Sequence, residues 1–314
     1  MSIVERALDK LRPKSGSAAP SGVNERPSHT PEVTTVDRSP RPPTIAPSTG
    51  IHAPRTFPAD LRPVELDVED LEARGLLPPL EMQQGCVDEF RRLKWPIMAA
   101  LLGRGGERVA TSNRLMITSS VPSEGKTFTS LNLSLAMTRE RETPIILVDA
   151  DVVRASLTEA LGLGGRPGLV DLLQTDAPDI KQVLLRASVP GLYVLPAGRS
   201  SPHTPELIGS DHMSQLAQLL SDLAPEGVVV FDTPPVLATN DAQVLARYMG
   251  YILMVVRANS TLRRTVQDAL GLIADGPPVA FVLNQASRAA VSGYYGGYYR
   301  AGYEDRSATG EPSA

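Results

Sequence analysis

Cysteine, aromatic residues and long apolar runs are all scarce in this chain of 314 residues. The single cysteine, Cys86, cannot form an internal disulfide, and the 4 histidines show no zinc-ligand spacing. No apolar run approaches the roughly 20 residues that cross a bilayer, and the first residues do not resemble a secretory signal. The net charge of −4 offers no basic field, so we expect no nucleic-acid partner. These absences predict a soluble protein of a reducing compartment, by default the cytoplasm.

Proline is in excess, with 28 residues, and eleven of them lie between residues 12 and 63. That segment buries too little apolar surface to offset its ordering entropy, so residues 13–63 are predicted to form a disordered linker. Before it, residues 1–12 place apolar side chains from Ile3 to Leu11 at helical spacing. This short amphipathic helix is either marginally stable or a docking element for a partner or a membrane surface.

Residues 64–112 are predicted to form a helical lead-in, with helices over 64–77 and 88–102. Beyond it, short β-branched runs alternate with longer amphipathic stretches over residues 113–285. Strands are expected at 115–119, 145–149, 192–196, 228–232, 251–256 and 279–284. Helices are expected at 127–141, 210–223, 241–248 and 262–274. Continuous apolar strands alternating with helices predict an α/β fold, a mostly parallel sheet with helices on both faces.

A phosphate-binding loop is indicated at residues 120–127, which read Ser-Val-Pro-Ser-Glu-Gly-Lys-Thr. This is the pattern G-x-x-x-x-G-K-[ST] with Ser120 at the first glycine position. It lies between an expected strand and an expected helix, where backbone N–H groups and a helix N-terminus can cradle a polyphosphate. A chance Gly-Lys-Thr sequence at a strand–helix turn is the alternative.

Two apolar strands that end in acidic residues strengthen the first interpretation. Ile145–Asp149 is followed by Ala-Asp151, and Val228–Asp232 is followed by Thr-Pro-Pro. Acids at the carboxyl ends of parallel strands, beside a phosphate loop, are where Mg²⁺ or its waters are held. Capping of a following helix is the structural alternative for Asp149 and Asp232.

These three motifs, with Arg154 after the second, resemble those of the bacterial tyrosine kinases, the P-loop autokinases of exopolysaccharide synthesis. The resemblance covers about residues 85–303. The first ten residues, the proline-rich linker and the missing membrane segment are most similar to the exosortase-associated cytoplasmic autokinases. The resemblance implies a MinD/ParA-like P-loop kinase domain at residues 113–285, with ATP and Mg²⁺ as cofactors and tyrosine as phosphate acceptor.

The resemblance also implies roles for individual residues. Lys126 would bind phosphate, and Thr127 would ligate Mg²⁺. Asp149 would act on the attacking tyrosine hydroxyl as a base or metal ligand, while Asp151 and Asp232 would hold Mg²⁺, partly through water. The nucleotide-binding set consists of loop residues and one asparagine expected at the adenine, namely Ser123, Glu124, Gly125, Lys126, Thr127, Phe128 and Asn284.

Tyrosines are concentrated in the last part of the chain, residues 286–314, which has no periodic pattern and is predicted to be a flexible tail. Five of the 8 tyrosines fall within ten residues, at Tyr294, Tyr295, Tyr298, Tyr299 and Tyr303. A sticky low-complexity tail is one interpretation. The other, favoured by an ATP site on the same chain and by the resemblance, is an array of phosphate acceptors used in trans between neighbouring subunits.

Three positions depart from the family's pattern. Trp95 stands at the second arginine of the Glu-x-x-Arg-x-x-Arg motif that builds a ring-shaped oligomer in the family. Val153 takes the usual place of the arginine that here follows as Arg154. Ser123 replaces a common glycine in the loop, where we expect slight strain.

The expected partners are a homo-oligomer for phosphorylation in trans and a separate membrane co-polymerase protein as activator, which would recruit the chain to the inner face of the plasma membrane. Two other functions fit the phosphate loop. A ParA- or MinD-like partitioning ATPase would have the same fold, but it would carry a signature lysine where Val121 stands and would have no use for a tyrosine tail. A non-catalytic, nucleotide-gated regulator of a polysaccharide polymerase is the third.

Overall fold

The computed structural model describes residues 57–58, 60–103, 112–140, 143–175, 179–199 and 203–286. The predicted helix at residues 1–12, most of the predicted linker and all five clustered tyrosines lie outside these ranges. The predictions made for those segments therefore stay predictions.

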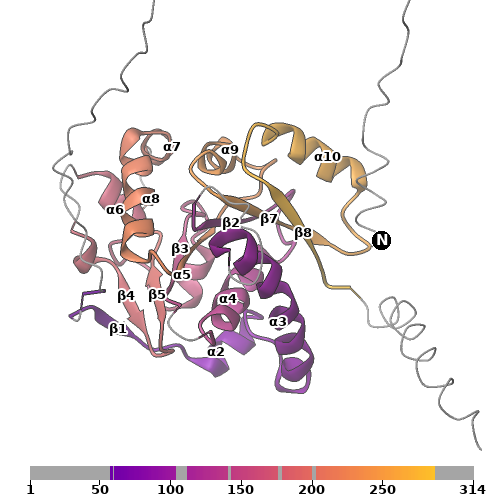
Figure 1. The fold of residues 1–314 in the computed structure, drawn as a ribbon, viewed down its shortest axis with the longest axis horizontal. Helices are drawn as coiled ribbons and strands as arrows, with labels where there is room; N and C mark the ends of the chain where they lie inside the picture. The colour runs from indigo at the N-terminus through magenta and orange to yellow at the C-terminus, as the bar shows by residue number, and fades with distance from the viewer. Residues whose placement is uncertain are drawn as a thin grey trace, which may run out of the picture. The chain divides into compact units, whose positions relative to one another are not determined.

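An eight-stranded sheet forms the centre of the described part of the chain, in the order β1-β4-β5-β3-β6-β2-β7-β8 (Figure 1). The strands are β1 (Arg62–Val64), β2 (Arg114–Ser119), β3 (Ile145–Asp149), β4 (Leu185–Ala187), β5 (Leu192–Leu195), β6 (Val228–Asp232), β7 (Tyr251–Arg257) and β8 (Val279–Asn284). Every neighbouring pair is parallel except β4–β5, which is antiparallel. The expected class, an α/β P-loop fold with a mostly parallel sheet, is confirmed.

Helices cover both faces of the sheet, and each face has its own apolar core. One core is shared with α2 (Val68–Ala73), α3 (Leu80–Leu102), α4 (Lys126–Met137) and α5 (Ser156–Ala160). The other is shared with α6 (Leu169–Leu173), α7 (Thr204–Ile208), α8 (Asp211–Leu223), α9 (Asn240–Ala246) and α10 (Arg263–Leu272). A short 3₁₀ helix spans Ile180–Gln182. Because β3 and β6 are covered on both sides, every one of their residues is buried, which explains their continuous apolar sequence.

Residues near the expected end of the linker, at residue 63, pack against the folded part of the chain. The ring of Phe57 stacks on Tyr193 with centroids 3.8 Å apart, Leu61 is buried, and β1 starts at Arg62. A three-residue edge strand has too few positions to show a period, so composition alone could not reveal β1.

Helix α3 begins at Leu80, eight residues before the expected start, and continues through Pro96. Proline removes one backbone donor from a helix interior. Pro96 lies on the exposed side of α3, where water can hydrate the carbonyl that loses its partner. The opposite side buries Ile97, Met98 and Leu101 against the sheet, and this burial outweighs the local cost.

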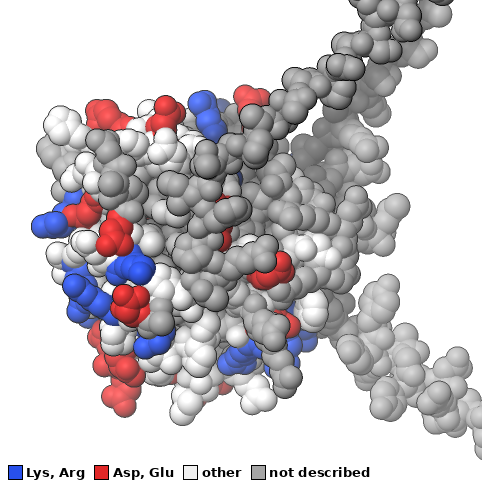
Figure 2. Space-filling model, turned by 60° about the vertical axis from the view of Figure 1, so that its left-hand side comes forward, with Lys and Arg blue, Asp and Glu red and all other residues white. Residues whose placement is uncertain are grey.

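The described surface carries charges of both signs. Among the side chains visible on the face in Figure 2, acidic and basic residues lie interspersed with uncharged ones, so this face presents no field of a single sign. None of the helices in the described ranges combines the length and the hydropathy needed to span a lipid bilayer.

Candidate functional site

The loop at residues 120–127 joins β2 to α4 at the carboxyl edge of the parallel strands, as the motif predicts. Two of its residues have left-handed backbone conformations, Ser123 with φ 66° and Gly125 with φ 95°. The expected strain at Ser123 is therefore present. Gly125 is needed for a second reason, because a Cβ there would lie 2.0 Å from Nδ2 of Asn284. The loop comes too close to β8 for any side chain at that position.

Glu124 is buried and organises the loop through its carboxylate. The side chain accepts hydrogen bonds from the backbone N–H of Val121 at 2.8 Å, from the N–H of Arg257 at 3.1 Å and from the hydroxyl of Thr261. The carbonyl of Glu124 accepts from Nδ2 of Asn284 at 2.9 Å. These bonds attach the loop to the ends of β7 and β8, so Glu124 and Asn284 hold the loop in its conformation. Whether they also contact a nucleotide stays a prediction.

Lys126 and Asp151 form an ion pair inside the site, with Nζ and Oδ2 3.0 Å apart. The side chains are only 8% and 3% exposed, so both charges depend on each other for stabilisation. The structure thus brings together two of the three predicted catalytic residues. The ammonium group that is expected to hold phosphate is kept at the loop by a carboxylate from the end of β3.

Asp149, the third predicted catalytic residue, lies beside Asp232 in the register of β3 and β6. Its Oδ2 accepts from the N–H of Thr158 at 2.8 Å and from the Thr158 hydroxyl at 2.7 Å, while Oδ1 accepts from the N–H of Asp151 at 3.2 Å. Asp149 therefore hydrogen-bonds to the first turn of α5. Capping of a following helix is the structural alternative to metal binding that the sequence left open for this residue. Burial, followed by the charge of Asp232, raises the pKa of Asp149 to about 7.

Asp232 is completely buried at the end of β6. Oδ1 accepts from the hydroxyl of Ser130 at 3.1 Å, whereas Oδ2 has no hydrogen-bond partner among the described residues. Burial raises the pKa of Asp232 to about 6, although the charge of Lys126 and the hydroxyl of Thr127 oppose the shift. A buried oxygen without a partner is costly, so this atom fits a position reserved for Mg²⁺ or a water bound to it.

Protein ligands alone do not build a metal centre here. Within the described ranges, no three His, Cys, Asp or Glu side chains converge in a group that could hold a metal ion. Mg²⁺ in nucleotide sites is commonly held by one or two protein ligands, with phosphate and water oxygens completing the octahedron. Thr127, in the first turn of α4, and Asp232 suit that mode, because the hydroxyl of Thr127 lies close enough to the Asp232 carboxylate to lower its pKa.

Phe128 and the departures from the family's pattern lie around this centre. The ring of Phe128 is 5.9 Å from that of Phe90 on α3 and tilted to it, so Phe128 attaches α4 to α3. Val153 is 67% exposed and Trp95 is 53% exposed. Neither side chain fills a core position in the described structure, and both are free for contacts elsewhere.

One carboxylate near the site escaped the sequence analysis. Asp241 is buried at the beginning of α9, and its pKa is raised first by burial and then by the charges of Asp151 and Glu206. An acid in the first turn of a helix usually indicates only a cap. Its closeness to Asp151 depends on how the loop after β6 folds back, which no local pattern reveals.

Comparisons with known proteins point to one family, although no family model matches the chain. Tyrosine-protein kinase YwqD of Bacillus subtilis is 30% identical over 213 residues, which cover 67% of this chain and 86% of YwqD. Tyrosine-protein kinase ptk of Acinetobacter johnsonii is 30% identical over 187 residues, covering 59% of this chain. The match to ptk spans only 25% of that protein, and the match to tyrosine-protein kinase wzc of Salmonella typhimurium spans 27%.

A solved structure gives the same answer. The crystal structure of the VpsO kinase domain superposes with a TM-score of 0.57 and 26% identity, covering 70% of this chain and 100% of that domain. The phosphate loop at residues 120–127 and the buried acids Asp149, Asp151 and Asp232 are the motifs on which the resemblance to this family rests. The chain belongs to the bacterial tyrosine kinases.

Proposed function

We propose that the chain is an ATP-dependent protein-tyrosine autokinase that phosphorylates its own tyrosine cluster and thereby regulates exopolysaccharide polymerisation or export. The observation that carries the proposal is the buried pair of Lys126 and Asp151 at the phosphate loop, with the unpartnered oxygen of Asp232 beside it. This arrangement offers a cation for phosphate and an oxygen for a metal ion in one site. Relatives named as tyrosine-protein kinases support the type of reaction.

Positioning and charge neutralisation are the main requirements of phosphoryl transfer. The N–H groups of the loop and the ammonium of Lys126 would bind the phosphates of ATP. Thr127 and Asp232, with Asp151, would hold Mg²⁺, which when bound supplies positive charge to the phosphate oxygens. On binding, Lys126 would exchange part of its contact with Asp151 for phosphate oxygens, so that Asp151 becomes available to the metal or its waters.

The acceptor hydroxyl must lose a proton, because a tyrosine has a pKa of about 10. A carboxylate whose pKa is raised to about 7 binds a proton far more readily than an ordinary aspartate at neutral pH. Asp149 has that property and is our candidate base. Its Oδ2 is held by Thr158, so the bonds to α5 would have to loosen when a tyrosine enters.

The acceptors would be Tyr294, Tyr295, Tyr298, Tyr299 and Tyr303. Flanking glycines allow successive hydroxyls to reach one active site, and each phosphate adds about −1.5 to −2 charges. Accumulated charge on several tails would repel neighbouring subunits and weaken their association. Each subunit of a homo-oligomer would phosphorylate the tail of its neighbour. The oligomer would then dissociate as phosphates accumulate and reassemble when they are removed.

A separate membrane protein would act as activator, and it would recruit the chain from the cytoplasm to the inner face of the plasma membrane. Support comes from the YwqD relative, most of whose length this chain matches. We assign the chain to the exosortase-associated type on its first ten residues and its proline-rich linker. We expect the chain alone to have a basal activity that the activator raises, and an activity that the activator leaves unchanged would contradict this role.

The test is incubation of the purified chain with Mg-ATP, followed by mapping of phosphotyrosine. We expect phosphotyrosine on the cluster and none in the Lys126→Ala variant or in a variant with the five tyrosines replaced by phenylalanine. Circular dichroism of each variant controls for folding. ATP hydrolysis or nucleotide-dependent dimers without phosphotyrosine would instead indicate a partitioning ATPase, and ATP binding without turnover would indicate a regulator.

A further inference from the structure

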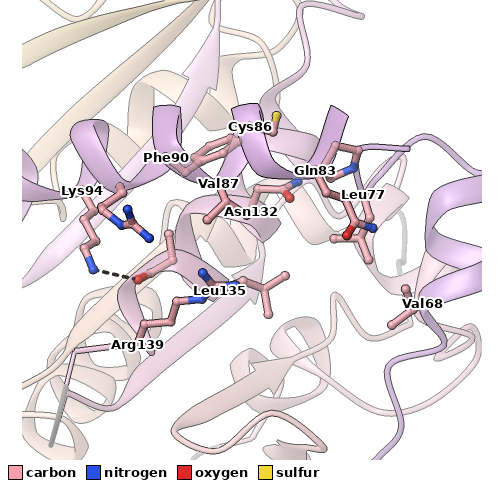
Figure 3. Close-up of a pocket in the computed structure, with 13 residues that line it drawn as sticks. Val68, Leu77, Gln83, Cys86, Val87, Phe90, Lys94, Asn132, Leu135 and Arg139 are labelled. Atoms are coloured by element: carbon pink, nitrogen blue, oxygen red, sulfur yellow. Dashed lines mark hydrogen bonds between the residues drawn. The ribbon is translucent and has the colours of Figure 1, made fainter. Parts of the chain in front are cut away.

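A cavity of about 230 Å³ lies between α3 and α4 (Figure 3). Its walls come from the segment around α2, from α3 between Gln83 and Lys94, and from the second half of α4 with the residues just after it. No residue of the loop at 120–127 lines it. Nothing in the proposed kinase reaction uses this space, so its chemistry can be considered separately.

Apolar side chains form the body of the cavity. Val87 and Phe90 project from α3 and Leu135 from α4 on facing sides of the space, and Leu77 closes one end. Phe90 is held in place by its contact with Phe128. The space is therefore a preformed apolar slot, the usual shape of a small-molecule site, although it is smaller than the roughly 300 Å³ at which drug-sized sites begin.

Among the described residues that line this cavity, the charged side chains are Arg91, Lys94 and Arg139, all cationic, with no aspartate or glutamate. Two of the cations are already paired with acids outside the lining, Arg91 with Asp88 at 3.0 Å and Lys94 with Glu140 at 2.5 Å.

Arg139 has a different position. No ion pair or hydrogen bond joins its guanidinium to any residue in the described ranges, although the side chain lines the cavity. It lies two residues beyond the end of α4 and is exposed, so it stands at the open rim of the cavity, on the opposite side from α3 (Figure 3). A guanidinium beside an apolar slot provides two or more parallel donors for a carboxylate, sulfonate or phosphate.

We propose that this cavity is a binding site for a small amphipathic anion, a free molecule with a compact apolar body and one acidic group. The body would lie between Val87, Phe90 and Leu135, and the acidic group would bind Arg139. An acidic group is favoured over a neutral one because the lining is cationic and contains no carboxylate.

The site lies on the helix that begins at the phosphate loop, yet it is separate from the loop. Asn132, which lines the cavity, donates from Nδ2 to the carbonyls of Leu76 and Phe128, both at 2.8 Å. It stands six residues beyond Lys126 on α4, about 9 Å along the helix axis. A ligand in the cavity and ATP at the loop can therefore be bound together, and Mg-ATP should not compete with the ligand.

The probe we choose is naphthalene-1-sulfonate, a compact two-ring aromatic body with one sulfonate, and its binding is followed by isothermal titration calorimetry. Titration of the full chain should give one saturable binding phase that persists with saturating Mg-ATP. Arg139→Gln should weaken binding about tenfold, the value of one charge-assisted contact. Arg264→Gln is the matched control, because that side chain is 90% exposed on α10, and its affinity should equal that of the unchanged chain.

A second variant and a chemical reporter localise the probe. Ala136→Met places a larger side chain in the cavity and should also weaken binding, with circular dichroism confirming the fold. Cys86 lines the cavity and is the only cysteine in the chain, so its alkylation by neutral iodoacetamide reports on this site alone. Saturating probe should slow alkylation in the unchanged chain and in Arg264→Gln.

Several outcomes would overturn the proposal. Affinity that is the same in Arg139→Gln, or that is lost equally in Arg264→Gln, would remove the role of Arg139. Displacement of the probe by Mg-ATP would place it at the phosphate loop. Binding that appears only when the chain self-associates would assign the cavity to a contact between copies. None of these results bears on phosphotyrosine formation, which tests the proposed function independently.

Discussion

Replacing Gly125 by alanine should disturb the phosphate loop in two separable ways. Alanine would have to adopt φ near 95°, which costs an L-residue about 1–2 kcal/mol. Its Cβ would also lie 2.0 Å from Nδ2 of Asn284, a distance that cannot persist. The asparagine would have to move and lose its bond to the carbonyl of Glu124, at about 1 kcal/mol. The free energy of unfolding should fall by about 2–3 kcal/mol.

A double-mutant cycle distinguishes the two contributions. Asn284→Ala alone should cost about 1 kcal/mol, since it removes the bond to the carbonyl of Glu124, while the second bond of this side chain, which Oδ1 accepts from the N–H of Gln285 at 2.9 Å, is exposed and can be replaced by water. The double variant should lose no more than Gly125→Ala, so the two costs should fall short of additivity by about 1 kcal/mol. Gly75→Ala is the matched control, because Gly75 has φ 71° and no atom within 4 Å of the added Cβ.

Urea unfolding followed by circular dichroism measures all four variants. The control should show only the conformational cost of about 1–2 kcal/mol. Additive losses at Gly125 and Asn284, within about 0.5 kcal/mol, would refute the reasoning that the asparagine packs against the loop glycine. A Gly75→Ala variant as unstable as Gly125→Ala would refute the argument from the close approach of β8.

Three further predictions follow from the burial of charges. Lys126→Met should lower the unfolding free energy of the nucleotide-free chain by about 3 kcal/mol in urea, because Asp151 is left buried without its partner, and adding Asp151→Asn should recover most of the loss. Lys94→Met should cost only about 1 kcal/mol, because the side chain of Glu140 is 33% exposed and can be hydrated; equal losses at the two lysines would contradict this. Because burial raises the pKa of Asp149 to about 7, its folded form binds a proton that the unfolded form has released, so stability without nucleotide should fall as pH rises from about 4 to about 7. The urea midpoint, plotted against pH over that range, should have a shallower slope in Asp149→Asn than in the unchanged chain. An unchanged slope would contradict the raised pKa of Asp149.

The phosphate loop and the buried acids could be predicted from the sequence because their signals are local. Strand, loop and helix are consecutive around Gly125 and Lys126, and each acid directly follows its own apolar strand. Parallel strands bring their carboxyl ends to one edge, so Asp149 and Asp232 meet there by register. Both the motif and the topology therefore lead to the same site.

What the sequence could not reveal depends on long-range contacts. The carboxylate of Glu124 reaches Arg257 and Thr261, and Asn284 reaches back to the loop across 160 positions. Nothing in the order of residues around Glu124 distinguishes a loop scaffold from a phosphate contact. The antiparallel strand β4 has only three residues, too few for a pattern to indicate its direction.

The proposed function requires that the site on one copy transfers phosphate to the tyrosine cluster of another. Its most direct test mixes two full-length variants with Mg-ATP. One carries Lys126→Ala and an intact cluster, and the other carries an intact site with Tyr294, Tyr295, Tyr298, Tyr299 and Tyr303 replaced by phenylalanine. We predict phosphotyrosine on the cluster of the Lys126→Ala chain, and only in the mixture. Release of phosphate from ATP with no phosphotyrosine on either chain would contradict the claim.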